Sequence, residues 1–436
     1  MLTELLVDAY HRRPATLAVA DTHQSLTYKQ LTLLASVLRN LFLRETDCPR
    51  VGLMLPASSI FPAALFGVLW SGKTVVPLNF LLHAEELARV VEDAGLDLIL
   101  TIHHFDELST KLPARSLFLE DLPLRRRVAL AMLRRLPPPP SVDPDATAVL
   151  LYTSGTTAGP KGVELTHNNL YTNCIDTIDS LKFEPGHRFL NILPPFHVFG
   201  LTANVLIPIV LGASVHAIPR FSPVAVLKTV AQQKISIMLA IPSMYAAMLK
   251  TKSGAPDSFR SIYLAVSGGE PLPEGVHAGL EKRFGVVLRQ GYGLTETSPV
   301  VAVCSADNYR KGTVGKPIRN VRLRIVDADD RDVAAGQEGE ILIQGPGVMK
   351  GYFGKPDETR KVLSEDGWFS SGDVGRIDSE GYLAVTGRAK EMLIIGGENV
   401  FPREIEAVLE THEAVMQVAV IGVPDDLRGQ APIAFV

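Results

Sequence analysis

Short apolar runs alternate with longer segments of helical period between residues 50 and 270, and this alternation restricts the fold more than any other feature. A short apolar run is typical of a buried strand, and a longer amphipathic segment is typical of a helix that covers a sheet. Regular alternation of the two predicts parallel strands joined by crossover helices. Thr27 and Gln30 fit a capping box that starts an earlier helix. The runs that we assign to strands are 50–55, 96–101, 188–193, 235–240 and 261–266.

The pattern changes twice towards the C-terminus. From about residue 312, short segments rich in valine and isoleucine are broken by glycine, as at 321–327 and 339–344, which predicts a β-rich region. Near residue 387 a strand pair and a helix over 402–412 are expected to follow. A chain of 436 residues exceeds the size at which one hydrophobic core keeps growing, so we expect more than one structural unit.

Charge and cysteine content exclude several classes of function. The formal net charge of −4 shows no basic excess, so we expect no nucleic-acid partner. The three cysteines, Cys48, Cys174 and Cys304, lack paired or metal-ligand spacing, which predicts free thiols in a reducing compartment. Residues 1–10 predict a short amphipathic helix with acidic residues rather than a secretory signal, and no apolar run reaches the roughly 18 residues that span a bilayer. We therefore expect a cytoplasmic protein.

Residues 124–136 carry five arginines, and apolar residues recur among them at helical spacing, at Leu124, Val128, Met132 and Leu136. A surface helix that packs on its own domain accounts for this pattern. Peripheral contact of the same helix with an anionic membrane is the alternative. The proline-rich stretch 137–144 predicts a connection between two α/β units.

The segment YTSGTTAGPKG at 152–162 follows an apolar run and combines glycines, hydroxyls and a lysine. Small residues let the backbone close on an anion, hydroxyl and amide groups donate hydrogen bonds, and Lys161 adds a mobile positive charge, so the loop predicts a phosphate site. It is not a Walker A loop, because Pro160 takes the place of the second glycine and Gly162 that of the magnesium-binding hydroxyl. The magnesium ligand must therefore come from elsewhere.

A second loop, QGYGLTET at 290–297, supplies a candidate carboxylate in Glu296. With these two loops, the sequence resembles the adenylate-forming superfamily of AMP-binding enzymes, which includes acyl-CoA synthetases, aryl-CoA ligases, luciferases and nonribosomal adenylation domains. Within it, the chain is most similar to fatty acyl-CoA or acyl-carrier-protein synthetases. Further matches follow in the expected order along nearly the whole chain: SGGEP at 267–271, SGD at 371–373, GRAKE at 387–391 and GGENVFPREIE at 396–406.

The resemblance implies an α/β fold with a large N-terminal domain over 1–388. That domain would contain two doubly wound α/β subdomains, 1–140 and 141–310, of which the second begins with the phosphate loop. A β-rich subdomain with the form of a distorted barrel would occupy 311–388. An incomplete small α+β C-terminal domain, 389–436, would follow a hinge at Lys390.

The resemblance also implies a site where a carboxylic acid reacts with ATP to give an acyl-adenylate and pyrophosphate. Thr295 would donate to the α-phosphate, and Glu296 would hold Mg²⁺, with Thr153 as a second candidate ligand. One carboxylate is sufficient because Mg²⁺ keeps several waters. The residues that would hold the β- and γ-phosphates are Thr153, Ser154, Gly155, Thr156, Thr157 and Lys161.

The nucleoside would lie between the remaining motifs. Tyr292 would stack on adenine, Asp373 would accept from the ribose hydroxyls, and Arg388 would reach the same sugar, with Lys390 at the hinge beside them. The other residues assigned to the nucleotide slot are Gly268, Gly269, Glu270, Pro271, Gln290, Gly291 and Gly293.

The segment LPPFHVFG at 193–200 resembles the motif that lines the carboxylate end of the acyl pocket, with His197 at the aromatic gate position. A hydrogen-bonded core histidine is the alternative. The segments 202–212 and 241–249 are apolar and contain no cationic residue, which favours a medium- or long-chain fatty acid over a succinyl-bearing aryl acid. Methionines in and near these segments suit an apolar tunnel or ordinary packing equally well; they are Met238, Met244 and Met248.

Acyl transfer to a thiol would follow rotation of the small domain about the hinge, which would bring Gly396 and Gly397 to the site. The acceptor is either coenzyme A or the phosphopantetheine of an acyl carrier protein. An aryl-acid CoA ligase is the nearest alternative function, and a luciferase-like oxygenase or a nucleotide-binding protein without turnover are further ones.

The chain stops at Val436 inside a strand pattern, and the late lysine of the family has no match before that point. We expect a shortened or naturally short chain that binds ATP, AMP or acyl-AMP. Because loss of one preorganised electrostatic contact typically costs about 10²- to 10³-fold in rate, we also expect this chain to adenylate slowly.

Overall fold

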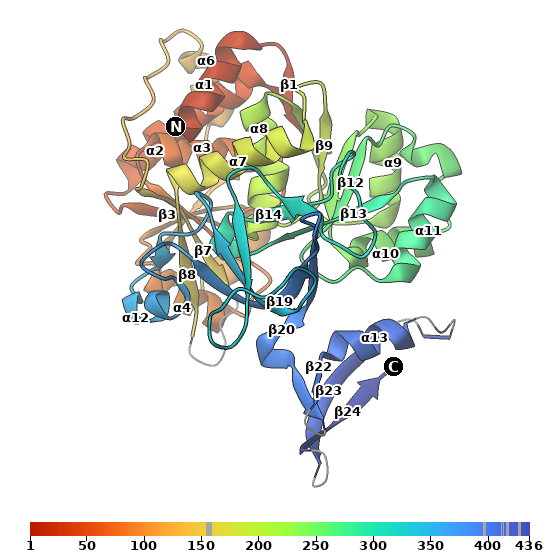
Figure 1. The fold of residues 1–436 in the computed structure, drawn as a ribbon. Helices are drawn as coiled ribbons and strands as arrows, with labels where there is room; N and C mark the ends of the chain where they lie inside the picture. Colours follow the sequence, from red (N-terminus) through yellow and green to blue (C-terminus); the bar gives the residue numbers. More distant parts are fainter. Residues whose placement is uncertain (154–158, 396–397, 411, 413, 416–417, 426–428) are drawn as a thin grey trace.

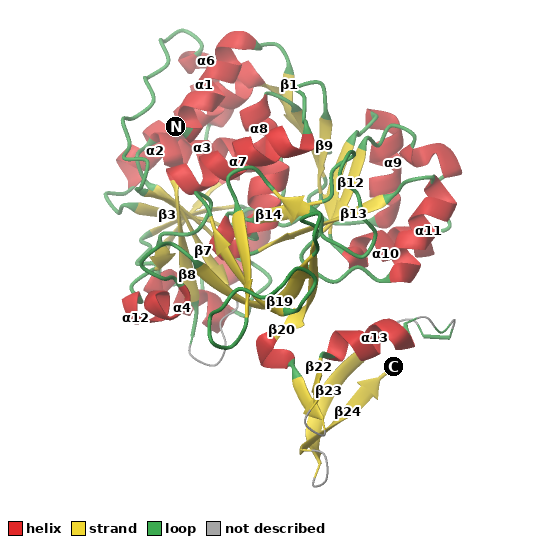
Figure 2. Cartoon of the chain, in the orientation of Figure 1, coloured by secondary structure: helices red, strands yellow, loops and turns green. Residues whose placement is uncertain are grey.

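The computed structural model describes residues 1–153, 159–395, 398–410, 412, 414–415, 418–425 and 429–436. A large α/β body contains two sheets with helices packed around them, and a smaller α+β unit lies below it in the view of Figure 1. Figure 2 shows the strands inside the large body and most helices on its outside. The strand β20 leads from the large body towards the small unit.

The first sheet has seven strands in the order β18-β8-β7-β4-β3-β5-β6. Five of them, β7, β4, β3, β5 and β6, run parallel, whereas β8 and β18 are antiparallel additions at one edge. The bounds are β3 Arg50–Leu53, β4 Thr74–Pro77, β5 Leu98–Thr101, β6 Arg115–Phe118, β7 Thr147–Thr153, β8 Lys161–Thr166 and β18 Gly351–Tyr352.

Alternate residues of these parallel strands enter two different cores, which explains why their sequences are apolar throughout. In β5, Leu98 and Leu100 lie in the large central core, while Ile99 lies in a second core with residues of α4. The central core also receives α2 and α3, and the first turn of α2 carries the predicted capping box between Thr27 and Gln30. The helices of this part are α2 Tyr28–Glu45, α3 Ile60–Trp70, α4 Ala84–Asp93, α5 Asp106–Ser109 and α6 Leu124–Ala131, with short turns η1 His103–Phe105 and η2 Leu119–Asp121.

The second sheet has nine strands in the order β15-β14-β13-β12-β11-β9-β10-β1-β2. The six strands from β13 to β1 are parallel, and antiparallel strands extend both edges. The bounds are β1 Leu17–Ala20, β2 Ser25–Thr27, β9 Arg188–Asn191, β10 Ser214–Ala217, β11 Ile237–Ala240, β12 Leu264–Ser267, β13 Leu288–Gly293, β14 Val300–Val303 and β15 Lys316–Pro317.

The nine-stranded sheet also separates two cores. Leu239 of β11 faces the central core, whereas Met238 and Ala240 face an outer core with residues of α9, α10 and α11. The central core receives residues of α1, α7, the π-helix η3 and α8. The bounds are α1 Leu2–Arg12, α7 His167–Leu181, η3 Phe199–Leu206, α8 Ile207–Leu211, α9 Pro223–Gln233, α10 Pro242–Lys250, η4 Pro256–Phe259 and α11 Glu274–Phe284.

All five runs that the sequence assigned to strands overlap β3, β5, β9, β11 and β12, so this part of the prediction is confirmed. The sheets do not follow the order of the chain. The strands β1 and β2, early in the sequence, belong to the nine-stranded sheet, and β7 and β8 belong to the seven-stranded sheet. The phosphate loop therefore leaves the first sheet rather than the second.

The β-rich region forms an open antiparallel sheet of four strands in the order β16-β17-β19-β20. The expected distorted barrel is wrong: in the part of the chain that the structure describes, β16 and β20 are outer strands and do not pair with each other. Two further strands of the region instead extend the α/β sheets, β15 the nine-stranded one and β18 the seven-stranded one. The remaining bounds are β16 Arg322–Val326, β17 Gly339–Gln344, α12 Pro356–Val362, β19 Phe369–Ile377 and β20 Leu383–Arg388.

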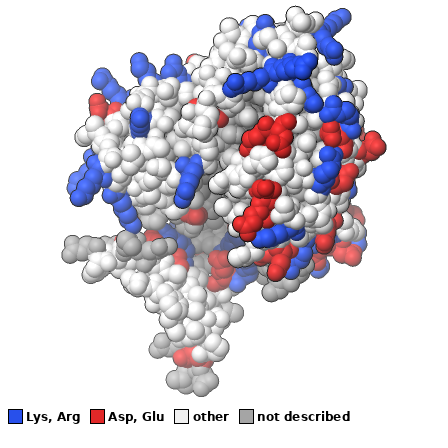
Figure 3. Space-filling model, turned by 180° about the vertical axis from the view of Figure 1, so that it is seen from behind, with Lys and Arg blue, Asp and Glu red and all other residues white. Residues whose placement is uncertain are grey.

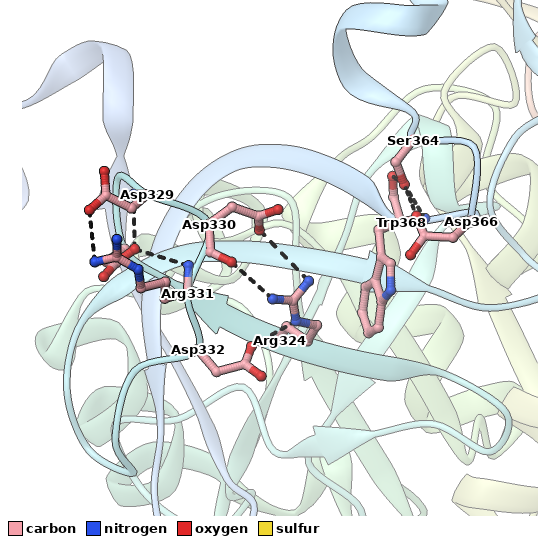
Figure 4. A network of polar contacts seen from close by, with 9 residues as sticks. Arg324, Asp329, Asp330, Arg331, Asp332, Ser364, Asp366 and Trp368 are labelled. Atoms are coloured by element: carbon pink, nitrogen blue, oxygen red, sulfur yellow. Dashed lines mark hydrogen bonds and ion pairs between the residues drawn. The ribbon is translucent and has the colours of Figure 1, made fainter.

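A polar network fixes the turn after β16 on the outer face of this sheet (Figure 4). The Arg324 guanidinium donates to Asp332 Oδ1 at 2.7 Å and also contacts Asp330. The same guanidinium lies 5.5 Å from the ring centroid of Trp368. The two aspartates are largely exposed, although Arg324 is only 28% exposed, so these contacts orient the turn and contribute little to stability.

The small unit combines a four-stranded antiparallel sheet, in the order β22-β21-β24-β23, with one helix. Leu393, Val418 and Val420 form its small core, against which Ile405 and Leu409 of the helix pack. The predicted helix over 402–412 is present as α13 Pro402–Leu409. The remaining bounds are η6 Ala389–Glu391, β21 Leu393–Ile395, β22 Glu398–Val400, β23 Ala419–Asp425 and β24 Gly429–Phe435.

The first eight residues of the arginine-rich segment 124–136 form α6, and the segment packs on the first α/β unit. Leu124, Val128 and Leu136 lie against the central core, as the surface-helix interpretation expects. Met132 does not share their environment, because 52% of its surface is exposed. No helix among the described residues is both long and apolar enough to cross a membrane.

Candidate active site

A cavity of about 910 Å³ collects side chains from nearly all of the predicted motifs. Its walls come from the β7–β8 hairpin, the segment before η3, the loops after β12 and β13, strands β18 and β19, and the segment after β20. Loops that follow the carboxyl ends of parallel strands meet at one edge of a sheet, which is the usual place of a site in an open α/β fold. The two loops singled out in the sequence thus open into the same cavity through Thr153, Lys161, Thr295 and Glu296.

The lysine of the phosphate loop is held by the segment around α12. Thr153 and Lys161 face each other as paired residues at the end of the β7–β8 hairpin. Lys161 Nζ lies 3.0 Å from Glu358 Oε2 and 5.2 Å from the ring centroid of Tyr352. The candidates Ser154, Gly155, Thr156 and Thr157 lie outside the described residues.

Glu296 lies on η5 (Thr295–Thr297), directly after a turn that requires glycine. A Cβ atom at Gly293 would lie 1.9 Å from the carbonyl oxygen of Pro299, so a side chain there would collide with the backbone. The Glu296 carboxylate accepts from the Tyr352 hydroxyl at 2.8 Å, and its backbone carbonyl accepts from Met349 N at 2.8 Å. The carboxylate next to the phosphate loop is therefore oriented by β18.

Sequence reasoning missed Tyr352. The tyrosine reaches the site because the two-residue strand β18 pairs with β8, which places Tyr352 opposite Val163. Its position thus depends on the pairing of Val163 with Tyr352, which lie almost 190 residues apart in the sequence. No local motif signals that pairing. Burial and the Glu296 carboxylate raise the pKa of the Tyr352 hydroxyl, so it remains a donor.

The donor set suits magnesium bound together with phosphate oxygens. Glu296 offers the carboxylate and Thr153 a hydroxyl at the same cavity, and the described residues contain no cluster of three or more His, Cys, Asp or Glu that could hold a metal alone. Mg²⁺ usually takes one or two protein oxygens and completes its shell with waters and phosphates. The residues present therefore fit this ion.

The predicted ribose side is a buried carboxylate between two partners. Asp373, only 4% exposed, accepts from the Tyr292 hydroxyl at 2.6 Å and pairs with Arg388 Nε at 3.1 Å. The pairing of β19 with β20 places Asp373 and Arg388 opposite each other. Burial raises the pKa of the Asp373 carboxyl, while Tyr292 and Arg388 act in the opposite direction. Tyr292 and Arg388 line the cavity, and Asp373 supports them from behind.

Most other residues assigned to the nucleotide slot line the cavity, and two do not. Pro271 is exposed at the surface. Gln290 lies in β13 directly before Gly291, which lines the cavity. Gln290 instead lines a separate cavity of about 270 Å³ beside α11. The predicted slot residues at the main cavity are Gly268, Gly269, Glu270, Gly291, Gly293 and Lys390.

The other residues that line the cavity are mostly apolar, and we call this part of its wall the apolar arm. Ala203 of η3 and Leu181 of α7 belong to it, and among the side chains named here there is no lysine or arginine. Met244 also lines the cavity, whereas Met238 and Met248 belong to the outer core, because they lie on the opposite face of the nine-stranded sheet. The residues of the arm are Thr177, Leu181, Leu193, Val198, Phe199, Gly200, Ala203, Ile207, Leu239, Ile241, Met244, Val266, Val300 and Val303.

His197 lies at the cavity wall at the end of a row of aromatic rings. Its ring centroid is 4.8 Å from that of Phe196, which is 4.9 Å from that of Phe80, and Phe80 stacks on Phe105 at 4.5 Å. The side chain is exposed to the cavity, yet the surrounding protein desolvates the ring and lowers the pKa of His197. Phe80 lies in a turn after β4 and Phe105 is the last residue of η1 after β5, and sequence reasoning missed both because no motif includes either residue.

Comparison with known families gives two matches that together cover most of the chain. A profile described as AMP-binding enzyme matches residues 6–353, and one described as AMP-binding enzyme C-terminal domain matches residues 404–436.

Similar proteins include ligases for both fatty and aromatic acids. A long-chain-fatty-acid–CoA ligase of Bacillus subtilis (strain 168) is 33% identical over 479 residues, which span 100% of this chain and 85% of the relative. A feruloyl-CoA synthase of Amycolatopsis sp is 34% identical over 435 residues, spanning 97% and 86%. Among solved structures, an anthranilate CoA ligase in complex with anthranoyl-AMP superposes with a TM-score of 0.91 at 26% identity and covers 99% of this chain and 86% of that one.

Proposed function

This chain belongs to the AMP-binding enzyme family and is an ATP-dependent acid–thiol ligase of the acyl-CoA synthetase type, and we propose that its substrate is a medium- or long-chain fatty acid. The observation that carries the proposal is the apolar arm, which receives side chains from α7, η3, β11 and β14 and contains no cation. An acyl chain gains free energy by leaving water for such a surface, roughly 0.8 kcal/mol for each buried CH₂ group. A second carboxylate in the substrate would find no partner in the arm.

At the polar end, the first step brings a carboxylate against an anionic α-phosphate. Two unit charges about 4 Å apart repel by roughly 4 kcal/mol at an effective dielectric constant near 20, so the site must offset this repulsion. Lys161 and Thr153 would bind the phosphates that leave as pyrophosphate, and Thr295 would donate to the α-phosphate. Bound Mg²⁺ would supply further positive charge there, held by Glu296 with Thr153 as the second ligand.

On the nucleoside side, the chain's own residues would orient adenosine rather than react. Tyr292 would stack on the base, and its hydroxyl is already fixed by Asp373. Arg388 and Lys390 border the cavity on this side, and Asp373 lies behind Tyr292 and Arg388. Its oxygens have further acceptor capacity, so Asp373 would accept from ribose hydroxyls that displace one of these partners. Gly268 and Gly269 leave room beside the base because they carry no side chain.

Thioester formation would follow with the thiol of coenzyme A, and the phosphopantetheine of an acyl carrier protein is the alternative acceptor. The hinge position of Lys390 and the domain ranges 1–388 and 389–436 remain proposals of the same kind.

An aryl-acid CoA ligase is the second candidate. The aromatic row that ends at His197 favours it, because a planar acid could stack against rings at the carboxylate end. The similar feruloyl-CoA synthase and anthranilate CoA ligase act on such acids by name.

One experiment separates these functions. Pyrophosphate release is measured with acetate, octanoate, palmitate, ferulate and anthranilate, each with coenzyme A or a carrier protein as acceptor. We expect the highest kcat/KM for the longer fatty acids with coenzyme A. A higher kcat/KM for ferulate or anthranilate would contradict the fatty acid proposal and favour an aryl-acid ligase. Release of phosphate without pyrophosphate would contradict the ligase chemistry.

We also propose that the segment 124–136, which contains α6, contacts anionic membranes peripherally. Leu130, Met132 and Leu133 are 49%, 52% and 84% exposed, and Arg134 and Arg135 follow them directly. Seen from behind, basic side chains gather along the upper part of the large domain (Figure 3). Each basic residue near an anionic surface contributes about 1 kcal/mol. Sedimentation with vesicles containing phosphatidylserine should carry the protein down, and Leu133→Asp should abolish it; equal sedimentation of both proteins would contradict the contact.

A further inference from the structure

Glu358 pairs with the lysine of the phosphate loop, although no predicted motif includes it. The residue lies on α12, which follows β18 directly. Glu358 Oε2 is 3.0 Å from Lys161 Nζ, and Glu358 Oε1 is 2.6 Å from Lys361 Nζ. Glu358 is thus placed between two ammonium groups, one of which belongs to the active site.

The same segment touches the phosphate side of the cavity at two more points. Lys355 Nζ donates to the carbonyl oxygen of Pro160 at 2.7 Å, next to Lys161 in the chain. Tyr352 donates to Glu296. β18 and α12 therefore connect both candidate phosphate-side loops, and a change at Glu358 acts where the leaving group would bind.

The Glu358 carboxylate is an anion at any working pH. Hydrogen bonds and charge from Lys361 and then Lys161 lower the pKa of Glu358 to about 2. The Lys161 side chain is 25% exposed and that of Glu358 36%, so the pair is accessible to water and to competing anions. An exposed pair of this kind is weak enough to exchange partners.

We propose that Glu358 is a positioning residue that holds Lys161 when the phosphate site is empty and competes with pyrophosphate for Lys161 when pyrophosphate leaves. The inference rests on the proposed role of Lys161 in binding phosphates. Nucleotide binding then exchanges one anionic partner of Lys161 for another, and departure of pyrophosphate is assisted because Lys161 does not remain unpaired.

The test compares binding of inorganic pyrophosphate with Mg²⁺ by titration calorimetry in four proteins: wild type, Glu358→Gln, Asp357→Asn and Lys161→Ala. Asp357 is the matched control because it lies on the same helix and pairs with Arg360 instead. We expect Glu358→Gln to bind pyrophosphate about two- to fivefold more tightly and to show correspondingly stronger product inhibition, with an unchanged KM for the fatty acid. Asp357→Asn should match wild type.

The outcomes distinguish the two proposals. Lys161→Ala should weaken pyrophosphate binding by at least about tenfold, since a charge-assisted contact is lost. If Lys161→Ala binds as wild type does, the phosphate role of Lys161 fails, and the role of Glu358 fails with it. If Lys161→Ala is weakened while Glu358→Gln equals wild type or Asp357→Asn, only the role of Glu358 is overturned. Thermal unfolding of each variant shows that all four proteins are folded.

Discussion

The phosphate end and the apolar arm of the cavity are built on different principles. At the phosphate end, polar side chains are already paired within the protein: Lys161 with Glu358, Glu296 with Tyr352, and Asp373 with Tyr292 and Arg388. In the arm, mostly apolar residues line the space between the elements that carry them, which are α7, η3, α8, α10, β11, β12 and β14. Under the proposed function, phosphates would have to exchange hydrogen-bond partners with the protein at the first end, whereas an acyl chain would only displace water from the second.

This difference separates orientation from selection. Fixed donors and charges at the phosphate end suit a step in which charge develops at defined atoms. Apart from Thr177 the arm is apolar, so under the proposed function it would select substrates by length and width. Substitutions at the two ends should therefore alter different kinetic quantities.

The largest effect is expected at the phosphate end. Glu296→Gln removes the carboxylate charge and should lower the rate of pyrophosphate release by about 10²- to 10³-fold with every acid tested, since a preorganised charge is lost. Tyr352→Phe is its control, because it removes only the hydroxyl that orients Glu296 and should cost about tenfold or less. Equal losses in the two variants would contradict a direct role for the Glu296 charge.

A filled arm should change selection without changing the chemistry. Ala203→Phe places a ring inside the arm, so kcat/KM for palmitate should fall by about 10- to 200-fold. Acetate, which does not reach Ala203, serves as the control within the same protein and should be affected by less than about threefold. A uniform loss for both acids would mean that the ring disturbs the fold rather than the arm.

The protonation of His197 should not affect the rate of pyrophosphate release near neutral pH. Burial lowers the pKa of His197 below the ordinary value, so the ring is neutral at pH 7 and has no charge to lose as the pH rises. His197→Phe should keep the pH dependence of pyrophosphate release between about pH 6.5 and 8 and change the rate by less than about fivefold. An inflection in that range that is present in wild type and lost in the variant would assign His197 a titrating role.

The smallest effect concerns the loss of folding stability that burial of the Asp373 carboxylate causes. Since burial raises the folded pKa of Asp373, the folded protein binds this proton more readily than the unfolded chain, and the ionised group lowers stability at neutral pH. Asp373→Asn should raise Tm at pH 7.5 by about 2 °C, and the gain should shrink as the pH falls through the raised pKa. A lower Tm of the variant at pH 7.5 would show that the contacts to Tyr292 and Arg388 outweigh the burial.

The same contrast explains what the sequence could predict. Buried strands such as β11 and β12 have continuous apolar sequences, and the loops around Lys161 and Glu296 combine glycine with donors over a few residues, so both were recognisable locally. Tyr352 and Glu358 were not, because the two-residue strand β18 pairs Tyr352 with β8, and Glu358 lies on α12, which follows that strand. The apolar segments of the arm were expected, yet Met238 faces the outer core, since alternation along β11 decides its side. The prediction of a distorted barrel was wrong because β15 and β18 pair with the α/β sheets instead.

A crystal structure with a non-hydrolysable dodecanoyl-adenylate analogue tests the division of the cavity most directly. We predict that its adenosine lies beside Tyr292 and Gly268 and that its acyl chain runs along Ala203 towards Thr177. An acyl chain that leaves the arm and lies against the protein surface, or an adenosine bound away from Tyr292, would contradict this division.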